Sequence, residues 1–114
     1  MKKVYNLLGI AQRAGKLSAG TMAAKNSLMR RRAVLLIISE DIAENSREEL
    51  LNCSNRQGIP TITFGNKYDL GTALGKAYRV AITINEAGMA QAILDELAES
   101  GAEIKSMGVV EWPK

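Results

Sequence analysis

Apolar residues recur along this chain with two different periods, and these periods predict where helices and strands lie. Helical spacing in the first segment predicts an amphipathic helix over residues 3–14, which Gly15 ends. The run Ala-Val-Leu-Leu-Ile-Ile-Ser at 33–39 is rich in branched side chains, which is typical of a central strand buried on both faces. Shorter apolar runs predict two further strands, over residues 61–64 and 79–84.

Helical spacing returns between these strands. A second helix is predicted over residues 20–31, and a last helix runs from about residue 86 to residue 100. The third helix is expected to start near Ser46, because Ser46 and Glu49 have the spacing of a capping box. Gly58 is expected to end that helix.

Two short elements complete the pattern. Residues 17–19 fit either a short strand or an extended connection. Residues 65–68 indicate a turn, after which Asp69 is expected to cap a short helix that reaches about Gly75. The alternation of helices and strands predicts an α/β protein, namely a three-layer α/β/α sandwich with a mixed sheet of about four strands.

The length of 114 residues is enough for one folded domain without disulfides or metal. We expect a single domain over residues 1–114, with a core from about 4 to 100 and a C-terminal tail at 101–114. The tail carries Val109, Val110 and Trp112, which could pack back on the domain or dock on a partner. The sequence leaves both possibilities open.

Composition excludes several classes of protein. Hydrophobic residues make up 46% of the chain, as in globular proteins, but no apolar run approaches the roughly 20 residues of a membrane span. No signal peptide is expected, because no small-residue cleavage site follows the first apolar stretch. The absence of histidine excludes histidine acid–base catalysis, and a lone Cys53 makes a zinc site unexpected. We therefore expect no metal, no cofactor and a reducing, cytoplasmic location.

Charge is distributed unevenly along the chain, although the net charge is only +3. Residues 1–39 contain eight basic side chains and no acidic one, whereas the remainder contains seven basic and twelve acidic side chains. A solvated surface usually mixes the two signs. This asymmetry predicts one basic face that meets a polyanion.

The basic segment contains a candidate phosphate-binding helix start at Gly20 and Thr21. The first turn of a helix has N–H groups without partners and carries the positive end of the helix dipole. A glycine at that point lets a phosphate approach those donors. Lys16 lies before the turn and Lys25 lies within the helix, so these residues indicate an RNA-backbone site. The alternative is an ordinary surface helix with solvated lysines.

Two other patterns are weaker candidates for a functional site. Asn-Lys-Tyr-Asp at 66–69 matches the guanine-reading motif of GTPases, but the nearest glycine pair, at 9–15, has the wrong spacing and lacks the serine or threonine that binds magnesium. Glu40 and Asp41 form a carboxylate pair after the central strand, which fits a solvated loop better than a catalytic site. A nucleotide-handling enzyme is therefore not expected.

The stretch Leu-Gly-Thr-Ala-Leu-Gly-Lys-Ala-Tyr-Arg-Val at 70–80 resembles the kink-turn-binding ribosomal protein family of the L7Ae type. The run Leu-Leu-Gly-Ile-Ala-Gln-Arg-Ala-Gly-Lys at 7–16 is similar to the small bacterial branch of that family. The resemblance covers about residues 4–97, in a consistent order. It implies an α/β/α sandwich and an RNA-binding protein without catalytic activity.

The resemblance implies that RNA lies first on the start of the second helix, where the family has the pattern Gly-x-Asn-Glu-x-x-Lys. Only Gly20 matches this pattern. Met22, Ala23 and Asn26 stand where the family has Asn, Glu and Lys. Since the family's Asn and Glu supply hydrogen bonds to sheared G·A pairs, we expect backbone and charge contacts to dominate here.

The second implied element is the loop before the strand expected at Arg79, where Tyr78 could stack on a base and Arg79 could meet a phosphate. The arginines at 30–32 could extend the basic patch, or could simply be favourable cations at a helix end. The residues expected to bind RNA are Lys16, Gly20, Thr21, Met22, Lys25, Asn26, Lys76, Ala77, Tyr78 and Arg79.

Together these features predict a non-enzymatic RNA-binding protein associated with the ribosome or with translation. Its expected partners are structured RNA, either a kink-turn or ribosomal RNA, and ribosomal proteins, and it is expected to act as a monomer. The alternative is a protein-interaction module of the same fold, which docks on a ribosomal or other protein and has little RNA affinity. The altered motif after Gly20 and the tail with Trp112 favour this alternative, whereas the basic N-terminal segment opposes it.

Overall fold

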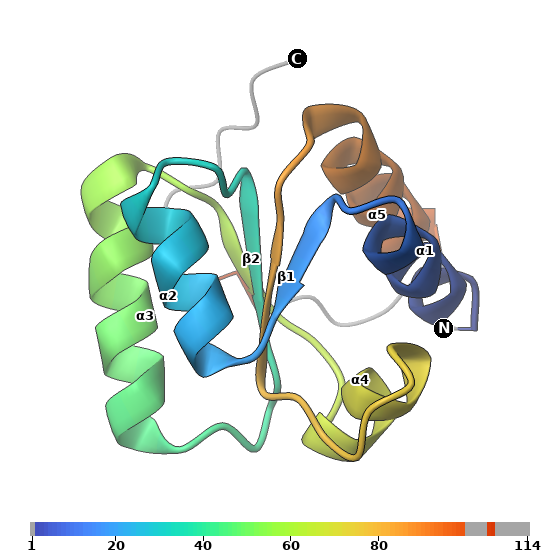
Figure 1. Ribbon diagram of the computed structural model, residues 1–114, viewed down its shortest axis with the longest axis horizontal. Coiled ribbons are helices and arrows are strands. Elements are labelled where there is room, and N and C mark those ends of the chain that lie inside the picture. The colour runs from blue at the N-terminus through green and yellow to red at the C-terminus, as the bar shows by residue number, and fades with distance from the viewer. Residues whose placement is uncertain (1, 100–104, 107–114) are drawn as a thin grey trace.

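The computed structural model describes residues 2–99 and 105–106, and it has helices on both faces of a mixed sheet, as predicted (Figure 1). The predicted end of the last helix at residue 100 and the tail residues Val109, Val110 and Trp112 lie outside the described residues. In chain order the elements are α1 (Lys2–Arg13), β1 (Leu17–Ala19), α2 (Thr21–Met29), β2 (Leu35–Ile38), α3 (Glu44–Gln57), β3 (Thr61–Thr63), α4 (Lys67–Ala73), β4 (Ala81–Ile84), α5 (Ala87–Glu99) and β5 (Lys105–Ser106).

The sheet has the strand order β1-β4-β2-β3-β5. β2 and β3 run parallel, and the other neighbouring strands are antiparallel. β2 and β4 lie inside the sheet, and every residue of both strands is buried. This confirms the prediction that the apolar run after residue 33 forms a central strand covered on both faces.

Alternate residues of β2 divide the core between two layers of helices. Leu35 and Ile37 pack in a cluster with residues of α1, α4 and α5. Leu36 and Ile38 pack in a second cluster with α2 and α3. Because successive side chains of a strand point to opposite faces, one continuous apolar run supplies both clusters. In Figure 1, α2 and α3 accordingly lie on one side of the sheet and α1, α4 and α5 on the other.

Gly58 ends α3 as predicted, but both predicted N-terminal helix caps are wrong. α3 begins at Glu44, so Ser46 and its expected capping box lie inside the first turn, and no side chain caps this helix. The acidic Glu44 is itself favourable beside the positive end of the helix. α4 begins at Lys67, and its cap is Asn66, not Asp69: the Asn66 side chain accepts hydrogen bonds from the N–H groups of Tyr68 and Asp69 at 3.0 and 2.9 Å.

Two element boundaries also differ from the prediction. α2 ends at Met29 and not at Arg31, because Arg31 adopts a positive φ of 57°, which no α-helix continues. β4 begins at Ala81, so Arg79 lies in the preceding loop rather than at the start of a strand. The N–H of Arg79 donates to the carbonyl of Lys67 at 2.9 Å, which holds this residue against the start of α4.

Candidate nucleic-acid interface

The start of α2 presents open backbone donors. Gly20 precedes the helix with φ 105° and ψ 154°, a conformation that L side chains rarely adopt, and no side chain caps the helix. The N–H of Gly20 donates to the carbonyl of Ala81 at 2.8 Å, which fixes the helix start beside β4. The N–H groups of the first helical turn are therefore directed outward at the positive end of the helix dipole, where an anion would be favourable.

The loop between α4 and β4, residues 74–80, folds back against α4. The N–H of Lys76 donates to the carbonyl of Gly71 at 2.8 Å. A Cβ on Gly71 would lie only 2.5 Å from the Cα of Tyr78, so this contact requires glycine. Lys76 and Ala77 are exposed on the loop, as expected for residues that could meet a ligand.

The loop and the start of α2 meet at Gly20 and Arg79. A Cβ on Gly20 would lie 3.9 Å from the Nε of Arg79, which places the guanidinium beside the helix start. Nη1 of Arg79 donates to the carbonyl of Tyr78 at 2.7 Å. Its Nε is buried and has no hydrogen-bond partner in the described part of the chain. An arginine donor without a partner is therefore held next to the open N–H groups of α2.

Large exposed side chains surround this point. Met22 is 71% exposed on the first turn of α2, and Tyr78 is 55% exposed on the loop. Tyr68, on α4, is 60% exposed, and the ammonium of Lys67 lies 5.3 Å from its ring centroid and 6.0 Å from that of Tyr78. Exposed tyrosines next to cations are suited to stacking on unpaired bases. We call the surface formed by residues 20–22, 67–68 and 76–79 the candidate RNA face.

Sequence reasoning missed Lys67 and Tyr68, because it treated residues 65–68 as a turn. The signal was present in Asn66, which is a favourable cap residue directly before the helix that carries both side chains. The Asn-Lys-Tyr-Asp pattern therefore has a structural explanation: Asn66 caps α4 and its amide also donates to Asp69 at 3.0 Å. Thr21, at the start of α2, is half-buried.

Three of the predicted binding residues lie away from the meeting point of α2 and the loop. Lys16 lies at the opposite end of β1, since Leu17 pairs with Ile84, and its ammonium is 3.7 Å from Glu86. Lys25 forms an ion pair with Glu49 of α3. Asn26 is exposed one helical turn after the start of α2.

The charges of Lys25 and Lys16 are each balanced by an acidic partner, Glu49 and Glu86. A hydrogen bond to Glu49 raises the pKa of Lys25. The backbone N–H groups of Met89 and Gly88 lower the pKa of Glu86, and the charge of Lys16 contributes to that lowering. Their charge is thus less available to a ligand than that of an unpaired cation.

The eight cations of the first 39 residues do not share one face, contrary to the sequence-based prediction. Lys2, Lys3 and Arg13 lie on α1, whereas the arginines at 30–32 follow α2 on the other side of the sheet. Figure 1 also shows that the start of α2 and the loop before β4 lie in the lower half of the view, while the end of α2 lies in the upper half. The arginines therefore cannot extend the candidate RNA face.

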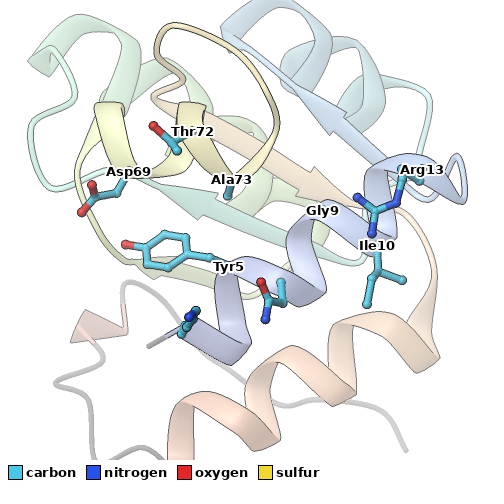
Figure 2. Close-up of a pocket in the computed structure, with 9 residues that line it drawn as sticks. Tyr5, Gly9, Ile10, Arg13, Asp69, Thr72 and Ala73 are labelled. Carbon is cyan, nitrogen blue, oxygen red and sulfur yellow. The ribbon is translucent and has the colours of Figure 1, made fainter.

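A groove of about 800 Å³ lies between α1 and α4 (Figure 2). Tyr5 lies along it, with Arg13 near one end and Asp69 across from the Tyr5 hydroxyl. Burial, and then the charges of Asp69 and Glu40, raise the pKa of Tyr5, so its phenol stays protonated at neutral pH. Ile10 is 44% exposed on the same wall. This mixture suits an interaction surface better than acid–base chemistry.

Residues 2–99 contain no cluster of three or more His, Cys, Asp or Glu side chains that could hold a metal ion. Of the predicted carboxylate pair, Asp41 accepts a hydrogen bond from the N–H of Lys67 at 3.0 Å, so it positions the start of α4. None of the helices among these residues is long and apolar enough to cross a membrane.

Relatives and solved structures resemble this chain over most of its length. It is 27% identical to the RNA-binding protein YlxQ of Bacillus subtilis, over 82% of this chain and 93% of that protein. It is 32% identical to the large ribosomal subunit protein eL8 of Cenarchaeum symbiosum, over 90% of this chain and 82% of that protein.

Two solved structures share the fold. A protein of unknown function from Bacillus halodurans matches with a TM-score of 0.79 and 30% identity, over 84% of this chain and 97% of that one. The 15.5 kD RNA-binding protein of Giardia lamblia matches with a TM-score of 0.66 and 20% identity, over 83% of this chain and 82% of that one. A sequence profile of the ribosomal protein L7Ae/L30e/S12e/Gadd45 family matches residues 2–94. The chain therefore belongs to the ribosomal protein L7Ae/L30e/S12e/Gadd45 family.

Proposed function

We propose that this chain is a non-enzymatic RNA-binding domain that holds structured RNA on the candidate RNA face. The observation that carries the proposal is the guanidinium of Arg79 beside Gly20, at the uncapped start of α2. Arginine and backbone N–H groups are the donors that proteins use most often on phosphate. The names of YlxQ and eL8 support RNA as the ligand and the ribosome or translation as the setting.

The way in which the face reads RNA follows from its side chains. Met22 and Ala23 have no polar atoms for the edges of G·A pairs, so phosphate contacts from α2 and Arg79 supply most of the affinity. Tyr78 and Tyr68 add stacking on unpaired bases. The protein accordingly binds RNA in a salt-sensitive manner with weak kink-turn selectivity, as a cytoplasmic monomer.

The test is a binding titration with two RNAs of equal length, one that forms a kink-turn and one with its G·A pairs replaced. We expect both RNAs to bind, and both affinities to fall steeply as salt rises from low to physiological concentration. Arg79→Met, which keeps the length of the side chain, should weaken both complexes and reduce the slope of log K against log salt by about 1. Lys3→Met, on α1, is the control that removes one cation from the other side of the sheet.

Each alternative has its own result. Binding of the kink-turn RNA alone would show that selectivity survives without the family's Asn and Glu. Failure to bind either RNA would contradict the proposed function. It would favour a protein-docking module, for which the groove between α1 and α4 is the second candidate surface because Ile10 is partly exposed along it.

A further inference from the structure

Three consecutive arginines, Arg30, Arg31 and Arg32, follow α2 at the end away from the candidate RNA face. α2 has nine residues, so at about 1.5 Å per residue its two ends lie about 12 Å apart. Arg56, near the end of α3, lines one pocket together with Arg31, and α2 and α3 both run upward in Figure 1. We call these four residues the arginine end.

Within the described part of the chain, no acidic side chain neutralises the charge of the arginine end. The side chains of Arg30, Arg31 and Arg32 are exposed, and they form no hydrogen bond or ion pair within residues 2–99. Lys25 and Arg47, on the same helical layer, are paired with acidic side chains. Arg56 donates from Nε to the carbonyl of Asn52 at 3.3 Å, and it has no carboxylate partner among residues 2–99.

A pocket of about 410 Å³ lies between the ends of α2 and α3. All of its lining residues are basic or neutral, and one of them, Lys25, is paired with Glu49. Arginine guanidinium groups around such a hollow can direct several N–H donors at one phosphate. The residues that line the pocket are Lys25, Met29, Arg31, Cys53, Arg56 and Gln57.

The backbone at Arg31 gives an independent indication. Its N–H donates to the carbonyl of Leu28 at 3.1 Å, and the N–H of Arg32 donates to that of Ser27 at 2.9 Å. This is the Schellman arrangement, in which the left-handed residue is usually glycine. α3 ends with the same arrangement, and there the left-handed residue is Gly58, with φ 67°. α2 instead has an arginine at φ 57°.

Helix capping does not account for this arginine. A cation is favourable near the C-terminal end of a helix, but Arg30 and Arg32 already supply that charge. Glycine at position 31 would close the helix with less strain, as Gly58 does for α3. Strained residues that persist in a fold are found preferentially at functional sites. The position therefore favours a role for the Arg31 side chain outside the fold itself.

We propose that the arginine end is a second RNA-phosphate site, so that the protein contacts two RNA segments, one at each end of α2. The inference rests on the proposed function for the RNA class of the ligand, but it concerns a different surface. The two sites lie at opposite ends of one helix, where Asn26 between them is neutral and the charge of Lys25 is paired with Glu49.

The first test is an NMR titration of the full chain with a 12-nucleotide oligouridylate and with a 12-base-pair RNA duplex. We expect two groups of signals to shift, one around Gly20 and Arg79 and one around Arg30–Arg32 and Arg56. Shifts at Gly20 and Arg79 alone would overturn this inference and leave the proposed function intact. Shifts at the arginine end alone would contradict the candidate RNA face but support the arginine end as an RNA site. The absence of any shift would overturn both proposals.

The second test is a triple variant, Arg30→Ala with Arg31→Gly and Arg32→Ala. We expect an unfolding temperature that is no lower than that of the parent, since glycine suits the backbone at position 31. Affinity for the oligouridylate should fall, and the slope of log K against log salt should flatten by about 2 if all three arginines contact phosphate. An unchanged slope would overturn the inference.

Two controls separate this site from general charge effects. Lys2→Ala with Lys3→Ala and Arg13→Ala removes the same charge from α1, on the other side of the sheet, and should change the slope less. An equal change in both triple variants would overturn a localised site. Polyglutamate at the same charge concentration should leave the arginine-end signals unmoved. Shifts with polyglutamate as large as those with RNA would assign this surface to an acidic protein and overturn the RNA assignment.

Discussion

Gly20 is the residue on which the geometry of the candidate RNA face depends. Its φ of 105° directs the chain from β1 into α2, and its N–H is bound to Ala81. A Cβ at this position would find space, since the nearest atom is 3.9 Å away on Arg79. The requirement for glycine is therefore conformational rather than steric crowding.

We expect Gly20→Ala to lower the free energy of unfolding by about 1–3 kcal/mol, because alanine would be held in a strained backbone conformation. The variant should also bind RNA more weakly, since relief of the strain would move the helix start relative to Arg79. Urea unfolding and an RNA titration measure the two effects separately.

The control is Gly58→Ala, which also places alanine at a positive φ but lies at the end of α3, with open space around it. It should lower stability by about 1 kcal/mol and leave RNA affinity unchanged. Equal loss of RNA affinity in both variants would mean that stability, and not the position of Gly20, determines binding.

At the scale of single elements, two helix starts show how far local sequence patterns can be trusted. Ser46 and Asn66 are both cap-forming residues with an acidic side chain three positions later, yet only Asn66 caps a helix. The chain enters α3 earlier, at Glu44, because the turn after β2 brings Ala43 into the cap position. The pattern identified both helices but could not determine where each begins.

We expect Asn66→Ala to lower the free energy of unfolding by about 1 kcal/mol, because it removes two hydrogen bonds to the first turn of α4. Ser46→Ala is the matched variant and should change stability by less than about 0.5 kcal/mol, since Ser46 caps nothing. Both values come from chemical unfolding monitored by circular dichroism. A larger loss for Ser46→Ala than for Asn66→Ala would contradict the observed helix starts.

At the scale of the whole molecule, Asn85 connects elements that are distant in sequence. Its Oδ1 accepts hydrogen bonds from Ser27 of α2 at 2.7 Å and from Thr83 of β4 at 3.1 Å. Its Nδ2 donates to the Oγ of Ser18 on β1 at 3.0 Å. These bonds fix α2 against the sheet and so fix both of its ends, where the two proposed RNA sites lie.

We expect Asn85→Ala to lower the free energy of unfolding by about 1–3 kcal/mol, because buried hydroxyl groups of Ser27 and Thr83 lose their partner. Asn55→Ala, on the exposed surface of α3, should be nearly neutral. Thermal and urea unfolding measure both variants. If Asn85→Ala were as neutral as Asn55→Ala, the network would not be what holds α2 on the sheet.

The sequence by itself determined the layered α/β architecture, the central strand after residue 33 and the family, because hydrophobic periodicity and the motif at 70–80 are local properties of the chain. Through the family resemblance it also predicted that Gly20, Tyr78 and Arg79 bind one ligand, and the structure places Gly20 beside Arg79. Tertiary structure alone decided how the cations are grouped. Pairing of β1 with β4 brings Gly20 next to Arg79 and places Lys16 at the opposite end of β1. The length of α2 separates Arg31 from Gly20 and Arg79. Such groupings depend on strand register and helix direction, which are set by long-range packing and not by neighbours in sequence.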